Sequence, residues 1–223
     1  MDKMIVYEDP VLLVVHKPAG IATETAKIGQ ADLVSELKNY RKKKGESTYI
    51  GVVHRLDQSV EGLLVFAKDA HTAKKLSNSL QEGSLTKKYV ALTAGVPQMQ
   101  EGVLTDFLIK DGRTNLSKVV PIDTPGAKEA SLSWKLLAHN DDVSLLEIEL
   151  FTGRHHQIRV QMAHAGFPLL GDLKYGSARG KELSKAYSIH RTALLAYQLC
   201  LIHPTEQKNM EFLLNIDKFK KIF

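Results

Sequence analysis

Short runs of aliphatic and β-branched residues recur along the whole chain, and their lengths predict strands. Most of these runs are bounded by Gly, Pro, Asn or Asp, which are typical of turns. One such turn, residues 139–142, joins two neighbouring runs and predicts a hairpin. The predicted strands are residues 11–15, 49–53, 63–67, 89–93, 103–109, 130–137, 143–150, 194–202 and 212–216.

Apolar residues three or four positions apart predict only a few helices. Each predicted helix is followed by a glycine, which is common just past a helix C-terminus. The three helices run from residue 33 to near Gly45, through residues 73–80 to Gly83, and over roughly residues 156–164 before Gly166.

Many strands with few helices between them favour an α+β fold, with a largely antiparallel mixed sheet and flanking helices. The chain has 223 residues, of which 43% are hydrophobic and 25% charged, so it can bury a sizeable core as one large domain or two small lobes. No internal repeat, low-complexity tract or long linker interrupts it. We therefore expect a single domain over residues 1–223.

The cysteine content and the first residues of the chain indicate where in the cell the protein acts. The one cysteine, Cys200, excludes an internal disulfide and a multi-cysteine zinc site. Charged residues and a proline follow the first few apolar-leaning positions, a pattern that fits neither a signal peptide nor a membrane span. We expect a cytoplasmic protein that does not bind a membrane.

The net charge of +5 is unevenly distributed. Residues 101–150 carry five Lys and Arg against nine Asp and Glu, a balance of −4, whereas residues 151–223 carry eleven against five, a balance of +6. A basic C-terminal third suits a polyanionic partner, although charge alone favours an ordinary solvated surface.

The segment that carries the most chemical information is residues 54–57, with the sequence HRLD, followed by the apolar run GLLVFAK at residues 62–68. It places Asp57 beside a predicted strand, with Arg55 two positions earlier. An aspartate there can act as a nucleophile, and an arginine can contact phosphate. The alternative is a turn or a helix cap, for which aspartate is equally suited.

Four separated segments stand out along the chain: VVHKPAG at 14–20, HRLD with GLL at 54–64, KKYVAL at 87–92, and TGRHHQIRV at 152–160 followed by 171–176, with HP at 203–204. In this order they resemble the RluA-type RNA pseudouridine synthases. The resemblance extends from about residue 5 to 205 and implies a pseudouridine synthase-like catalytic domain. It also implies the activity: the N1–C1′ bond of a uridine in RNA breaks, the uracil turns within the site, and C5 bonds to C1′, without a cofactor.

The resemblance assigns roles to five residues. Asp57 is the catalytic aspartate, whose action at the ribose C1′ is either direct attack or promotion of a glycal intermediate. Tyr89 stacks on the flipped uracil and helps remove the C5 proton, and Arg159 pairs with the catalytic aspartate and lowers its pKa. Arg55 fills the gap left by the flipped base, and Ile158 packs against that base. The ordinary alternatives are a strand aromatic for Tyr89, a surface ion pair for Arg159, a phosphate contact for Arg55 and a core aliphatic for Ile158.

Three positions depart from the usual family pattern. Val60 and Glu61 stand where the family usually has Thr-Ser, and His155 stands in place of a Thr. Val60 lacks a hydroxyl that could brace the Asp57 loop, and Glu61 adds a second carboxylate, which we expect to face away from Asp57. No histidine spacing matches a metal-ligand set, so we expect no metal site.

Two other functions compete with the synthase hypothesis. A glycoside or nucleoside hydrolase could use Asp57 and Glu61 as paired carboxylates, and a non-enzymatic RNA-binding module could use the basic surface alone. Neither uses Tyr89 and Arg159 together with Asp57. Because the resemblance begins near residue 5, no S4-type RNA-binding domain is expected, and we expect a monomer that acts on ribosomal or transfer RNA.

Overall fold

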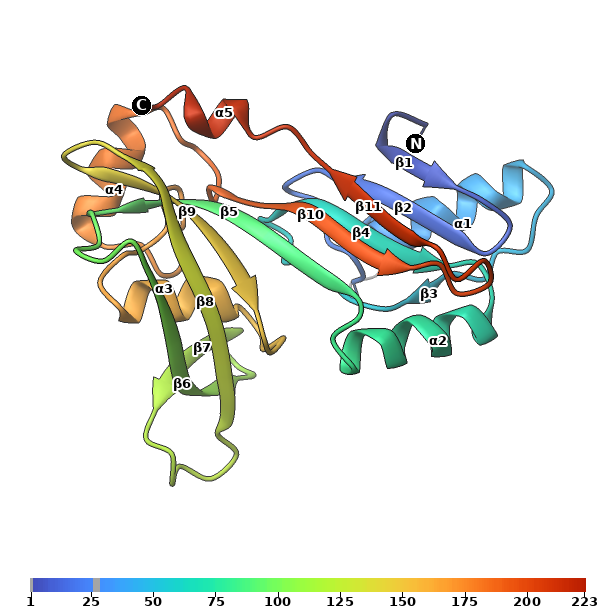
Figure 1. The fold of residues 1–223 in the computed structure, drawn as a ribbon, viewed down its shortest axis with the longest axis horizontal. Helices are drawn as coiled ribbons and strands as arrows, with labels where there is room; N and C mark the ends of the chain where they lie inside the picture. The colour runs from blue at the N-terminus through green and yellow to red at the C-terminus, as the bar shows by residue number, and fades with distance from the viewer. Residues whose placement is uncertain (1, 26–28) are drawn as a thin grey trace. The chain divides into compact units, whose positions relative to one another are not determined.

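A computed structural model describes residues 2–25 and 29–223 and divides the chain into two compact units (Figure 1). Unit 1 comprises Met1–Lys87 and Ala196–Leu214, and unit 2 comprises Lys88–Leu195 and Asn215–Phe223. The expectation of a single domain stays a prediction. In the described residues, no helix is both long and apolar enough to cross a membrane.

Unit 1 is built on a sheet with the strand order β1-β2-β4-β10, to which β3 adds beside β4 and β11 beside β10. The pairs β1–β2, β2–β4, β3–β4 and β10–β11 are antiparallel. The elements are the 3-10 turn η1 (Asp2–Met4), the strands β1 (Ile5–Glu8), β2 (Leu12–Lys17), β3 (Gly51–Val52), β4 (Glu61–Ala67), β10 (Leu194–Ile202, which begins in unit 2) and β11 (Asn209–Leu213), and the helices α1 (Leu33–Lys43) and α2 (Ala70–Gln81).

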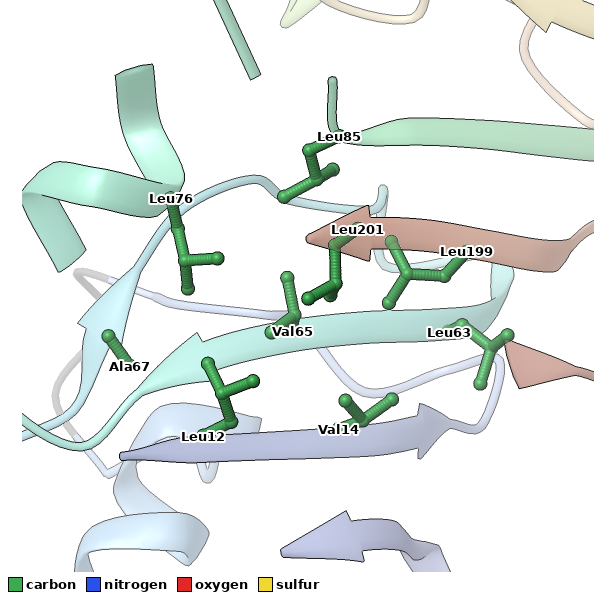
Figure 2. Packing of buried hydrophobic residues seen from close by; sticks show 9 residues of the cluster. All are labelled: Leu12, Val14, Leu63, Val65, Ala67, Leu76, Leu85, Leu199 and Leu201. Carbon is green, nitrogen blue, oxygen red and sulfur yellow. The ribbon is translucent and has the colours of Figure 1, made fainter. Parts of the chain in front are cut away.

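The core of unit 1 forms where alternate residues of three strands meet α2 (Figure 2). Successive side chains of a strand point to opposite faces, so every second residue of β2 and β4 lies on this side of the sheet. The intervening residues of these two strands are mostly buried as well, which explains their continuous apolar runs. The nine core residues are Leu12, Val14, Leu63, Val65, Ala67, Leu76, Leu85, Leu199 and Leu201.

Within unit 2 the strands follow the order β5-β9-β8-β6-β7, and each adjacent pair is antiparallel. Helix α3 contacts β6 and β7, and its Val160 joins a cluster with Leu108 and Ala130. The elements are β5 (Thr86–Ala94, which begins in unit 1), β6 (Glu101–Asp111), β7 (Leu116–Val120), β8 (Lys128–His139), β9 (Val143–Leu150), α3 (Gln157–His164), α4 (Ala178–Ala186) and α5 (Asp217–Lys220).

The predicted α+β class with a largely antiparallel sheet is confirmed, and most strands match their predicted ranges. Two predictions need correction: residues 49–53 form a strand only at Gly51–Val52, and the strand expected at 212–216 lies at Asn209–Leu213. The second error arose because β11 has alternating half-buried and exposed residues, so its apolar run does not mark its start. The strands β1 and β7 and the helix α4 were not predicted, since each is short or has few apolar residues.

Candidate active site

Asp57 lies in the loop between β3 and β4, and the backbone on its C-terminal side is fixed by a turn and a close contact. The backbone N–H of Val60 donates to the Asp57 carbonyl at 3.0 Å, which closes the turn. Gly62 follows with φ +145°, and a Cβ at this position would lie 2.5 Å from the Ala196 Cβ. Only glycine permits this conformation and this approach to β10, so Gly62 fixes the point where the loop enters β4.

The segment before α1 hydrogen-bonds to both neighbours of Asp57. The Thr23 hydroxyl binds the backbone of Leu56, with its oxygen 3.2 Å from the Leu56 nitrogen and 3.0 Å from the Leu56 carbonyl oxygen. The backbone N–H of Gly20 donates to the Gln58 carbonyl at 2.7 Å, and the Gln58 side-chain amide returns a bond to the Gly20 carbonyl at 2.9 Å. Asp57 itself is half-buried, so its flanking residues are held while it keeps some access to solvent.

Lys17, the last residue of β2, places a buried positive charge at the start of the segment that leads to α1. Its side chain is fully buried, and the ammonium donates to the carbonyl oxygens of Pro18 at 3.1 Å and Ile21 at 2.8 Å. Burial lowers the pKa of Lys17 to about 8, and the negative charges of Asp57 and Glu61 oppose this effect. Below that pH the lysine therefore carries a positive charge.

Glu61 forms an ion pair on the neighbouring strand. Its carboxylate lies 2.9 Å from His16 Nε2, and both side chains are partly exposed. Because His16 stands opposite Leu63 in the β2–β4 register, His16 and Glu61 are diagonal neighbours on one face of the sheet. Glu61, which departs from the family pattern, is thus paired with His16 on β2.

His54, the first residue of the HRLD segment, is buried and accepts a hydrogen bond from the backbone of β4. The Val65 backbone N–H donates to His54 Nε2 at 3.3 Å, so this nitrogen is unprotonated. Burial, with a smaller contribution from the positive charge of Lys87, holds the pKa of His54 well below its usual range. His54 is therefore neutral at physiological pH, whereas Arg55 beside it is exposed and accessible to a ligand.

In unit 2, Arg159 of α3 forms a bidentate ion pair with Asp172. Its Nε and one terminal nitrogen each lie 2.7 Å from a different oxygen of Asp172, and both side chains are almost completely buried. Burial by itself would raise the pKa of Asp172, but the hydrogen bonds and charge of Arg159 and the N–H groups of Lys174 and Tyr175 outweigh it and lower the pKa. Asp172 therefore stays ionised and fixes the plane of the Arg159 guanidinium.

Tyr175 connects this ion pair to β7. The Arg159 guanidinium lies 5.2 Å from the centre of the Tyr175 ring. The Tyr175 hydroxyl accepts from the Ser117 backbone N–H at 2.8 Å and lies 2.7 Å from His156 Nδ1. His155 stacks on His156 with ring centres 3.7 Å apart, and its Nδ1 lies 2.9 Å from the Ser117 hydroxyl. His155, which departs from the family pattern, thus links β7 to the residues just before α3.

The five residues singled out in the sequence occupy defined elements within the two units. Arg55 and Asp57 share the β3–β4 loop of unit 1. In unit 2, Ile158 and Arg159 are neighbours on α3, and Tyr89 lies on β5 opposite Ile148 of β9. The side chains of Tyr89 and Ile158 are buried. Their catalytic and binding roles stay predictions.

Sequence reasoning missed four residues that contact the candidate residues or their neighbours within each unit: Lys17 and Thr23 in unit 1, and Asp172 and Tyr175 in unit 2. Three of them lie in segments that carried the family resemblance, so their position in those segments was an available signal. Thr23 had no such signal, since its contact with Leu56 joins residues 33 positions apart. Among the described residues, no group of three or more His, Cys, Asp or Glu could hold a metal ion.

Comparison with known proteins identifies one family from the sequence and similar folds among solved structures. A family model described as RNA pseudouridylate synthase matches residues 11–164. The uncharacterized RNA pseudouridine synthase YhcT of Bacillus subtilis is 36% identical over 203 residues, which cover 90% of this chain and 64% of that protein. Ribosomal large subunit pseudouridine synthase C of Buchnera aphidicola is 32% identical over 211 residues, which cover 94% of this chain and 65% of that protein.

The chain thus spans slightly less than two thirds of the length of these two relatives. Among solved structures, human RNA pseudouridylate synthase domain containing 4 is similar with a TM-score of 0.78 and 25% identity. That similarity covers 98% of this chain and 90% of the human one. Human RNA pseudouridylate synthase domain containing 1, at 24% identity and a TM-score of 0.74, has the same fold.

Proposed function

Because the chain belongs to the RNA pseudouridylate synthase family, we propose that it isomerises uridine to pseudouridine at specific positions of structured RNA. The observation that carries the proposal is the setting of Asp57. This carboxylate is half-buried between two residues whose backbones are hydrogen-bonded to another segment, and Arg55, two residues earlier in the loop, is exposed. Such a setting fixes an acidic group while leaving it open to a substrate.

The reaction sets requirements that an aspartate in this setting meets. Breaking the N1–C1′ bond leaves the ribose electron-poor, and an ionised carboxylate next to C1′ stabilises or captures it. The uracil then turns and bonds through C5, and the hydrogen on C5 leaves as a proton. The product is an isomer of the substrate, so the net reaction consumes no oxidant, reductant or water. On this chemistry no cofactor is required.

Other residues are proposed in supporting roles. Tyr89 and Arg159 act with Asp57 as catalytic residues, and Arg55 and Ile158 bind the substrate, as the family resemblance implies. Asp172 supports Arg159, because a bidentate partner restricts the guanidinium to one orientation.

The proposed substrate is ribosomal RNA, with transfer RNA as the second candidate. Ribosomal RNA is favoured because several relatives are named ribosomal large subunit pseudouridine synthases. The protein is proposed to act as a cytoplasmic monomer.

Tritium release tests the proposal directly. RNA labelled at uridine C5 must release tritium into water when C5 bonds to C1′, whereas hydrolysis of the glycosidic bond releases free uracil instead. We expect release from ribosomal RNA with no free uracil, and pseudouridine at a small number of mapped positions. Free uracil would favour the hydrolase, and RNA binding without either product would favour the non-enzymatic module.

Replacing Arg55 with alanine is expected to weaken both binding and turnover on a folded RNA, and to do so less on a flexible single-stranded target. The reason is that extruding a base from a stacked helix costs a few kcal/mol, which a side chain that fills the gap offsets. Tritium release and filter binding with the two RNAs measure the difference. Equal losses on both RNAs would instead assign Arg55 to phosphate contact.

A further inference from the structure

A single buried hydroxyl binds both backbone groups of the residue that precedes Asp57. Thr23 is 3% exposed, and its Oγ1 accepts from the Leu56 N–H at 3.2 Å and donates to the Leu56 carbonyl at 3.0 Å. Leu56 is itself buried. A hydroxyl can donate once and accept twice, so Thr23 satisfies both groups with one side chain. Thr23 therefore sets the position of the Leu56 backbone, to which the backbone nitrogen of Asp57 is bonded.

Thr23 is in turn held by the start of α1. The backbone N–H of Val34 donates to the Thr23 carbonyl at 3.1 Å, and that of Leu33 donates to the Ala22 carbonyl at 3.0 Å. Asp32 caps the helix by accepting from Ser35, and its second oxygen accepts from the Thr25 N–H at 3.0 Å. Thr23 therefore connects the capped start of α1 to the Asp57 loop by hydrogen bonds.

The other flank of Asp57 is held independently, because Gly20 and Gln58 exchange two hydrogen bonds. Asp57 therefore stands between two fixed neighbours, and its backbone has little freedom left. The hydroxyl of Thr23 is thus a brace that reaches the loop from a different segment.

We infer that Thr23 is a positioning residue for Asp57, which holds the catalytic loop in place through the two hydrogen bonds to Leu56. The inference rests on the proposed function. A catalytic group that is displaced by about 1 Å can lose roughly 10²-fold in rate. Loss of the Thr23 hydroxyl leaves two buried backbone groups without this partner, and the loop moves to find others.

The test compares Thr23→Val, which removes the hydroxyl at nearly constant volume, with Thr23→Ser, which keeps it. Thr72→Val is the matched control. Thr72 is also a buried threonine of unit 1, and its hydroxyl donates to the Asp69 side chain at 2.7 Å at the start of α2. Tritium release gives kcat and KM, thermal unfolding gives stability, and amide hydrogen exchange reports the loop directly.

We expect Thr23→Val to lower kcat about ten- to a hundredfold, with a smaller change in KM and with faster exchange of the Leu56 amide. Thr23→Ser should retain the wild-type kcat and the slow exchange of the Leu56 amide. Thr72→Val should lower the stability of the protein without lowering kcat. The inference is overturned if Thr23→Val retains the wild-type kcat, or if Thr72→Val loses kcat to the same extent. If the wild-type protein releases no tritium, the proposed function fails, and unchanged exchange at Leu56 in Thr23→Val would separately overturn the brace.

Discussion

Replacing Asp57 with alanine is expected to lower pseudouridine formation by about 10⁴-fold or more, the order of effect that loss of a nucleophile has in other enzymes. RNA affinity should change only a few-fold, because Asp57 acts on the glycosidic bond and not on the phosphate backbone. Tritium release under single-turnover conditions measures the rate, and filter binding measures the affinity. A variant that retains substantial turnover would remove Asp57 from the mechanism.

Glu61→Gln is the matched control, since it neutralises the other carboxylate close to the loop. In the structure this carboxylate is paired with His16 at 2.9 Å, so we expect near wild-type turnover after its removal. A hydrolase that used Asp57 and Glu61 as paired acid and base would lose activity with either change. Equal losses in the two variants, together with free uracil from the wild-type protein, would therefore support hydrolysis.

Asp172→Asn is expected to lower the free energy of unfolding by about 3–5 kcal/mol, because it removes the charge of a buried, bidentate partner of the Arg159 guanidinium. Chemical denaturation followed by circular dichroism measures this loss. Asp142→Asn is the control, since it breaks an ion pair with Arg179 in which both side chains are largely exposed, and its stability should stay near that of wild type. Similar losses in both variants would show that burial does not distinguish the two pairs.

The effect of Asp172→Asn should also depend on pH. The pKa of Asp172 is lower in the folded protein than in the unfolded chain, so its ionised form stabilises the fold at every pH above the unfolded value, which is about 4. As the pH falls through the lowered folded pKa, this stabilisation is lost. The difference between wild type and Asp172→Asn should therefore be largest near neutral pH and shrink in acid.

The apolar runs alone were sufficient to predict most of the strands. The range 143–150 coincides with β9 and the range 194–202 with β10, because long, largely apolar runs leave little choice of conformation. Short or polar elements were not predictable in this way. The strand β7 has only five residues, and bonds from Tyr175 and His155, distant in sequence, hold Ser117 within it.

The sequence by itself determined the fold class, the family and the residue types of the site, since these follow from local periodicity and from segments that keep a fixed order. Only the tertiary structure decided the partners: Thr23 for Leu56, His16 for Glu61 and Asp172 for Arg159. The physical reason is that a hydrogen bond or ion pair depends on distances of about 3 Å between atoms, and folding creates those distances between residues that are far apart in the chain.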